Sequence, residues 1–269
     1  MSDDHGELLM WGRRTPKNRL IDHVDDPHVR EINQYVRELR AKQQRFVPFV
    51  SPRYGGVNAS LLAVNKTPGA LTDPANSGSG FLDFDNRDQG AVRHSRYLRE
   101  AGIEFSDVLS WNAIPWVGAN FDESDEIFRG AQALARVIEM MPELRVIMLH
   151  GREAKDMWNV TIQNSFPRVY ERHNPIQTWS LGFELVNPKN NSQTQIDQYE
   201  RELAQAFSKA ERLLRYSPPP MQRVYIEGDE ITDVAGTMPP EAPRSPTRTG
   251  NPAWEDDWGR DWPLPPDER

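Results

Sequence analysis

Short apolar runs alternate along the chain with segments in which apolar residues recur at helical spacing. The runs Ser60–Val64, Asp107–Trp111, Leu144–Leu149 and Ile176–Trp179 predict strands of a parallel sheet, buried on both faces. Helices are predicted over residues 27–45, 91–101 and 192–214, from a capping Ser124 onward, and from Gly151 through Trp158. We therefore predict one α/β domain over residues 21–216, a three-layer α/β/α sandwich with a mostly parallel central sheet.

Polar segments flank and interrupt this domain. Residues 1–20 are predicted to be flexible, Pro48–Pro52 to form a turn, and residues 70–90 to form a long functional or disordered loop. Residues 217–238 are predicted to add a hairpin. Residues 239–269 contain eight prolines and three tryptophans, which predicts a disordered acidic tail. Two roles for the tail stay open: it docks on a partner protein, or it folds back onto its own domain.

Composition and charge exclude several classes of protein. There is no apolar run long enough to span a bilayer and no N-terminal signal segment, so we expect a soluble cytoplasmic protein without membrane contacts. The chain has no cysteine, which excludes disulfides, cysteine-ligated metals and a thiol nucleophile. The net charge of −8 argues against nucleic acid as a partner. However, the 11 acidic and 5 basic side chains from Ser217 onward carry −6 of it, so the domain itself can present a basic face.

The candidate chemistry follows the predicted strands, where parallel sheets bind their ligands. The segments are Val64-Asn-Lys-Thr-Pro-Gly69 with Ser79-Gly80-Phe81 and Asp85-Asn86-Arg87-Asp88 downstream, Ser110-Trp-Asn-Ala-Ile-Pro-Trp116, Val146-Ile-Met-Leu-His-Gly151 and Ile176-Gln-Thr-Trp-Ser180. Their order and spacing resemble the uracil-DNA glycosylase superfamily over about residues 25–210, and most closely its bacterial branches whose first motif ends in Pro-Gly. The resemblance implies a uracil-DNA glycosylase-like fold and an enzyme that flips a base out of DNA and cuts its glycosidic bond without a metal or other cofactor.

The resemblance assigns base-binding roles to four residues. Phe81 matches the family's stacking ring, and Asn112 matches the amide that pairs with the edge of the pyrimidine. Gly69, after Pro68, stands where uracil-restricted relatives have a tyrosine, so the pocket is expected to admit a substituent at C5 of the base. The alternatives are a core phenylalanine at Phe81, a turn residue at Asn112 and a glycine that serves only the turn.

The first motif departs from the family in its catalytic position. Relatives carry an Asp, Asn or Glu that positions the attacking water, whereas the matching residues here are Asn65, Lys66 and Thr67. Asn65 can hold a water, but threonine is no base at neutral pH. The predicted loop offers three acidic substitutes: Asp73, Asp85 and Asp88.

The fourth motif departs as well, since Ser180 and Leu181 replace the His-Pro-Ser that stabilises the departing base. Such a donor is worth about 3–4 kcal/mol. Lys66, expected to be buried, and His150 are the candidate replacements, with a structural histidine as the alternative for His150. Leu181 and Phe183 match the apolar wedge that enters the duplex, or else pack onto the core.

Together these residues predict a monofunctional DNA glycosylase with DNA as its partner. The open C5 side suggests a modified pyrimidine such as (glucosyl-)hydroxymethylcytosine in phage DNA, and hence antiviral defence. Two alternatives are a uracil-excising repair glycosylase and a catalytically silent DNA- or base-binding protein on the same fold. Arg93, Arg96 and Arg99 are expected to form a solvated helix face that can touch phosphates.

Overall fold

The computed structural model describes residues 17–69, 72–86 and 88–216. The predicted hairpin over 217–238 and the predicted tail over 239–269 lie outside the described residues, as does most of the predicted N-terminal segment. Helix α2 (Lys17–Asp22) begins inside residues 1–20, and Leu20 is buried in the core. The first described helix therefore begins inside the segment that was predicted to be flexible.

A sheet of four parallel strands forms the centre of the fold. The strands are β2 (Leu61–Asn65), β4 (Val108–Asn112), β5 (Val146–His150) and β6 (Ile176–Thr178), in the order β4-β2-β5-β6. They match the predicted strands within two residues at each end. Apolar runs of this kind are typical of strands covered on both faces, and almost every residue of the sheet is buried.

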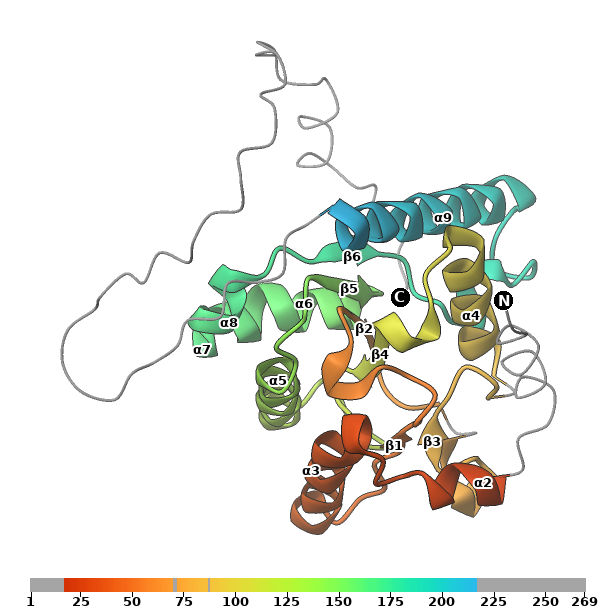
Figure 1. Cartoon of the computed structure of the whole chain (residues 1–269). Coiled ribbons are helices and arrows are strands. Elements are labelled where there is room, and N and C mark those ends of the chain that lie inside the picture. Colours follow the sequence, from red (N-terminus) through yellow and green to blue (C-terminus); the bar gives the residue numbers. More distant parts are fainter. Residues whose placement is uncertain (1–16, 70–71, 87, 217–269) are drawn as a thin grey trace, which may run out of the picture. The chain divides into compact units, whose positions relative to one another are not determined.

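Helices cover both faces of this sheet, which makes the fold an α/β fold in three layers (Figure 1). On one face, α4 (Gln89–Ala101) packs against α9 (Gln193–Tyr216), and α9 also contacts β5 and β6. On the other face lie α5 (Ser124–Glu139) and the helical segment that follows β5. The chain moves outward from β2 to β4 and then returns past β2 to β5, so the switch point between the two directions lies between β2 and β5.

Two segments that were predicted to lack regular structure contain short strands. Strand β1 (Phe49–Val50) lies in the predicted turn and pairs in parallel with β3 (Phe81–Leu82), which lies in the predicted loop. A strand of two residues is too short to produce an alternating pattern, so periodicity could not detect it. Helix α3 (Pro27–Gln43), predicted over 27–45, packs against β1. The loop also contains the short helix η3 (Pro74–Asn76).

Two helices differ from their predicted bounds or faces. Helix α5 begins at Ser124 itself, so Glu123 and not Ser124 occupies its N-cap position, and Phe128 on this helix is 45% exposed and stacks on Phe166. The helix after Gly151 does not end at Trp158. It runs as α6 (Arg152–Asp156), the π-helical turn η5 (Met157–Ile162) and α7 (Gln163–Ser165). No proline or glycine interrupts this segment before Pro167, which begins α8 (Pro167–Arg172).

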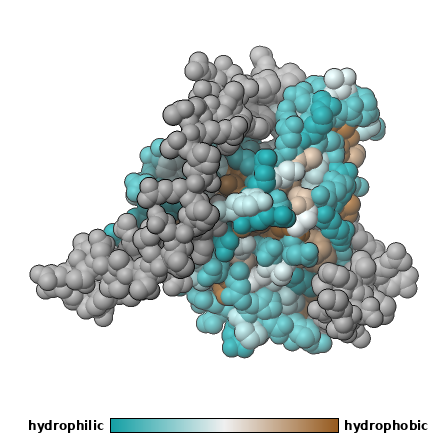
Figure 2. Space-filling view, turned by 45° about the horizontal axis from the view of Figure 1, so that its top comes forward, coloured by the Kyte–Doolittle hydropathy of each residue, from teal (hydrophilic) through white to brown (hydrophobic). Residues whose placement is uncertain are grey.

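The short helices η1 (Gly56–Asn58), η4 (Phe105–Asp107) and η6 (Phe183–Val186) complete the described fold. Figure 2 shows that hydrophilic side chains cover most of the described surface on the visible face, with small apolar areas between them. Among the described helices, none has the length and apolar character needed to cross a membrane.

Candidate functional site

A row of polar residues crosses the sheet at the carboxyl ends of its strands. Asn112 of β4 is in register with Asn65 of β2, and His150 of β5 is in register with Thr178 of β6. The pairing of β2 with β5 runs up to Val64 and Leu149, the residues directly before Asn65 and His150. In-register residues of a parallel sheet project from the same face. The strand ends selected from the sequence therefore meet at one edge.

Asn112 carries an unpaired polar atom at this edge. The residue is only 3% exposed, and its Oδ1 accepts no hydrogen bond from any described group. An unsatisfied buried acceptor costs about 1–3 kcal/mol, so native proteins usually give such atoms a partner or a function. The amide is thus available to a ligand that brings its own donor.

The ends of β2 and β4 are tied together beyond the last paired residues. The backbone N–H of Ala113 donates to the carbonyl of Asn65 at 2.7 Å, and that of Ile114 donates to Lys66 at 3.2 Å. These bonds fix the start of the first predicted motif against the second. Thr67 is half-buried and Pro68 is buried just beyond this point.

Lys66 is not buried as expected: its side chain is 54% exposed. Its Nζ lies 2.5 Å from Oε1 of Glu153 and 5.6 Å from the centre of the Phe121 ring. Burial raises the pKa of Glu153, but the hydrogen bond and charge of Lys66, with smaller contributions from its own backbone and Arg152, outweigh this and lower it overall. The two side chains therefore form a charged pair at neutral pH.

Lys66 and Glu153 line a groove of about 680 Å³ beside the switch point between β2 and β5. Its other walls come from the segment before α5 and from α5, α6 and η5, and they include Asn120, Phe121, Asp122, Ile127, Arg152, Asp156, Met157, Val160 and Thr161. Of the residues predicted to act on a substrate, only Lys66 lines it. Glu153 was not predicted from the sequence, because a single acidic residue in the first turn of a helix commonly serves only to stabilise the helix. Its position two residues after Gly151, close to the end of β5, was the available signal.

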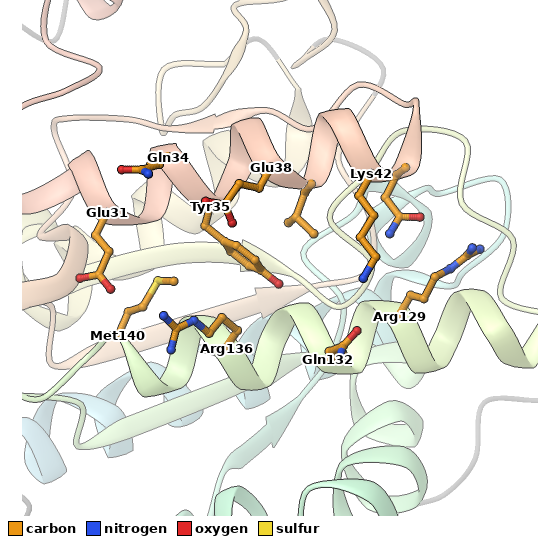
Figure 3. Close-up of a pocket in the computed structure, with 11 residues that line it drawn as sticks. Glu31, Gln34, Tyr35, Glu38, Lys42, Arg129, Gln132, Arg136 and Met140 are labelled. Carbon is orange, nitrogen blue, oxygen red and sulfur yellow. The ribbon is translucent and has the colours of Figure 1, made fainter.

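A second groove, of about 520 Å³, lies between α3 and α5 (Figure 3). Tyr35 and Lys42 project into it from α3, opposite Arg129 and Arg136 of α5. It contains none of the residues selected from the sequence and no strand end. We therefore place the candidate site at the carboxyl edge of the sheet.

His150 belongs to the interior. It is packed against His94 of α4 and Phe207 of α9, with ring centres 5.7 Å away in each case. Burial, and next the neighbouring His94, lower the pKa of His150 well below its usual value, and the backbone of Trp179, which acts in the opposite direction, does not offset this. The ring is therefore neutral at pH 7, in line with the structural alternative and not with a cationic donor.

The acidic residues of the first loop have structural partners. Asp73 accepts from the backbone of Ala75 at 2.9 Å and caps η3, and Asp88 likewise caps α4. Asp85 accepts a hydrogen bond of 2.6 Å from Arg53. These roles account for all three candidates without chemistry on a substrate.

Gly69 lies in open space. A Cβ placed there would meet no described atom within 4 Å, and the backbone of Gly69 is not in the left-handed region that favours glycine. Turn geometry therefore does not require a glycine here. Its missing side chain leaves room at this position.

Phe81 has a fixed backbone and a covered ring. Its N–H donates to Ser79 Oγ at 3.1 Å, and its carbonyl accepts from Asn86 Nδ2 at 2.9 Å. The ring lies 5.8 Å from that of Phe49 and is almost completely buried. A base can stack on it only after neighbouring groups move.

Arg93 holds the turn after β6. Its side chain is buried, whereas the sequence predicted a solvated one. Its Nη1 donates to the carbonyls of Leu181 at 3.2 Å and Gly182 at 2.9 Å, and its Nη2 pairs with Glu200 of α9 at 3.0 Å. Position 93 faces α9, whereas Arg96 and Arg99 are exposed as expected.

The two candidate wedge residues differ in exposure. Leu181 is 2% exposed and packs onto the core, in line with the alternative weighed from the sequence, whereas Phe183 is 45% exposed. Ser180 Oγ accepts from the N–H of Gly182 at 3.1 Å and so shapes the turn between them. Phe183 is the apolar residue that this turn presents to solvent.

Comparison with known proteins adds no relative. No protein-family model matches the chain, and no curated protein is significantly similar to it in sequence. Among the described residues, no cluster of three or more acidic or histidine side chains has the geometry of a metal site. A functional proposal therefore rests on the geometry of the carboxyl edge and on the motif resemblance.

Proposed function

We propose that the chain is a monofunctional DNA glycosylase that binds a flipped pyrimidine at the carboxyl edge of its sheet. The observation that carries the proposal is the buried, unpaired Oδ1 of Asn112. This acceptor complements a donor on a pyrimidine edge, either N3–H of uracil or the N4 amine of cytosine. The uracil-DNA glycosylase-like arrangement of motifs supplies the reaction class.

Base flipping explains why a strong acceptor would be kept unpaired. Extruding a base costs a few kcal/mol, and the enzyme recovers this by stacking and by hydrogen bonds to the base edge. The unpaired Asn112 oxygen lowers the stability of the unliganded protein, and a hydrogen bond from the bound base removes this cost. Phe81 is the proposed stacking ring, exposed when the base displaces the groups that cover it.

The open space at Gly69 supports a substrate with a substituent at C5 of the ring. Hydroxymethylcytosine and its glucosylated form, which occur in phage DNA, are the proposed substrates. A role in defence against phage follows from that substrate. Uracil, which needs no space at C5, would fit the same site.

A base-release assay tests the proposal. Purified protein is incubated with oligonucleotides that contain uracil and with phage DNA that contains hydroxymethylated or glucosylated cytosine. Free bases are identified by mass spectrometry and abasic sites by alkaline cleavage. We expect release of a C5-modified cytosine by the wild type and none by Asn112→Ala. Release of uracil alone would replace the proposed substrate with that of a repair enzyme.

A silent binding protein on the same fold is the second candidate. It is favoured by the engagement of Asp73, Asp85 and Asp88 in structural contacts and by Ser180 in place of the family's histidine. Binding of modified DNA with no base released from any substrate would establish this candidate. A third candidate is a role in which the protein acts through its tail, and deletion of residues 239–269 tests it. Unchanged base release and unchanged DNA binding after the deletion would show that neither activity needs the tail.

A further inference from the structure

We propose that Glu153 is the catalytic carboxylate of this site and acts together with Lys66. This inference rests on the proposed glycosylase function and supplies the acidic group that the first motif lacks. The carboxylate comes from the end of the third strand of the central sheet along the chain instead of the first. The two residues are 87 positions apart in the sequence and meet only in the folded protein.

The position of Glu153 fits this role. It lies in the first turn after β5, and its Oε1 is 2.5 Å from Nζ of Lys66, which follows β2. Asn65, the residue before Lys66, is in register with Asn112, so the pair and the proposed base-binding amide belong to the carboxyl ends of adjacent strands. The Glu153 side chain is 23% exposed and lines the groove beside the switch point, where water and a sugar can reach it.

The charge state of the pair also fits. Lys66 holds the pKa of Glu153 below its usual value, so the carboxylate stays ionised at neutral pH. An ionised carboxylate orients a water molecule and stabilises the positive charge that develops on the sugar as the glycosidic bond breaks. Phe121, with its ring centre 5.6 Å from Nζ, borders the pair on the other side.

The reaction balances with this pair alone and water. The water oxygen forms a bond to C1′ while the bond from C1′ to the base nitrogen breaks, and the bond's electron pair leaves with the base. Glu153 takes a proton from the water, and the Lys66 ammonium gives a proton to the departing base. A proton transfer from Glu153 to Lys66 across their hydrogen bond restores both charges. Proton transfer of this kind contributes about 100- to 10,000-fold to a rate.

The other acidic residues of the described edge are less suited. Asp73, Asp85 and Asp88 cap helices or pair with an arginine. Asp156 also lines the groove, on the same helix, but Lys66 pairs with Glu153 instead. Asp125, in the first turn of α5, is exposed and does not line the groove, so it offers a control carboxylate at the equivalent position of another helix.

The test compares Glu153→Gln with Asp125→Asn in the full-length protein, using the modified phage DNA of the base-release assay. We expect Glu153→Gln to lower kcat at least about 100-fold with little change in KM, and Asp125→Asn to stay within about 3-fold of the wild type. Glu153→Ala in added formate provides a second readout. A small carboxylate that enters the vacated space should restore part of kcat, which a structural role for Glu153 would not allow.

The outcomes separate this inference from the proposed function. Base release by the wild type with equal kcat in both variants would overturn the inference and leave the glycosylase intact. An equal fall in kcat in both variants would also overturn it, since loss of either charge would then suffice. A wild type that releases no base from any DNA would overturn both. Equal denaturant midpoints for wild type and Glu153→Gln show that a lost activity is not lost folding.

Discussion

Asn65 and Asn112 lie in register at the carboxyl ends of two adjacent parallel strands, and the carbonyl of Asn65 accepts a hydrogen bond from the residue after Asn112. Because residues in register on parallel strands project from the same face of the sheet, both side chains lie on one face. Two amides held side by side in this way form a rigid polar edge. Rigidity matters because a flipped base must find its hydrogen-bonding partner already in place.

Asn112→Leu should raise stability and abolish function. Leucine has a similar volume and removes the unpaired Oδ1, so we expect the free energy of unfolding to rise by about 1 kcal/mol. Base release should fall about 100-fold or more because the base loses its hydrogen-bonding partner. Urea denaturation and the base-release assay measure the two effects. A loss of stability of similar size would show that the oxygen has a partner in the folded protein.

Arg93→Met should release the turn after β6. The substitution leaves the carbonyls of Leu181 and Gly182 and the carboxylate of Glu200 without their shared donor. We expect a loss of about 2 kcal/mol in the free energy of unfolding and faster hydrogen exchange in residues 180–183. Arg96→Met is the matched control, because Arg96 also pairs with Glu200 but is exposed. It should cost less than about 1 kcal/mol and leave the exchange unchanged.

Long patterns in the sequence predicted the elements, whereas contacts between distant segments decided the site. The four strands of the central sheet followed from apolar runs because a strand buried on both faces needs such a run. Strands β1 and β3 were missed because a pair of two-residue strands is stabilised by its partner and leaves no local pattern. The edge to which the candidate residues belong was predictable, since parallel strands bring their carboxyl ends together.

Side-chain exposure and pairing were not predictable in the same way. Lys66 was expected to be buried because it follows a buried strand, yet its long side chain extends out to Glu153. Arg93 was assigned to a solvated face with Arg96 and Arg99, but its position on α4 turns it toward the β6 turn. Glu153 gave no signal beyond its position close to the end of β5. Each of these outcomes depends on a contact between segments far apart in the sequence.

The buried histidines should make the protein sensitive to mild acid. Burial lowers the pKa of His94 from 6.5 to about 4, and the pKa of His150 is lowered in the same direction. The unfolded chain therefore binds more protons than the folded one below pH 6.5. As the pH is lowered from this value, the free energy of unfolding decreases until the folded histidines are protonated as well. Each such histidine contributes a slope of about 1.4 kcal/mol per pH unit.

This slope can be measured by urea denaturation between pH 6.5 and about 5, above the range in which most carboxylates titrate. His94→Phe, which keeps an aromatic ring next to Phe207, should reduce the slope by the contribution of one histidine. A stability that does not change over this range in the wild type would mean that the histidines are charged or solvated in the folded protein.

Leu181 and Phe183 should separate folding from DNA binding. Leu181 is buried in the core, so Leu181→Ala should cost about 2–4 kcal/mol of stability. Phe183 is 45% exposed on the turn that Arg93 holds, so Phe183→Ala should change stability by less than about 1 kcal/mol.

If Phe183 enters the duplex beside the flipped base, Phe183→Ala should weaken binding to duplex DNA at least about 10-fold while binding to single-stranded DNA changes little, because only the duplex needs a wedge. Fluorescence anisotropy with the two DNA forms at one salt concentration measures both affinities. An equal loss on both forms would identify Phe183 as a general contact, and no loss on either would place the DNA elsewhere on the edge.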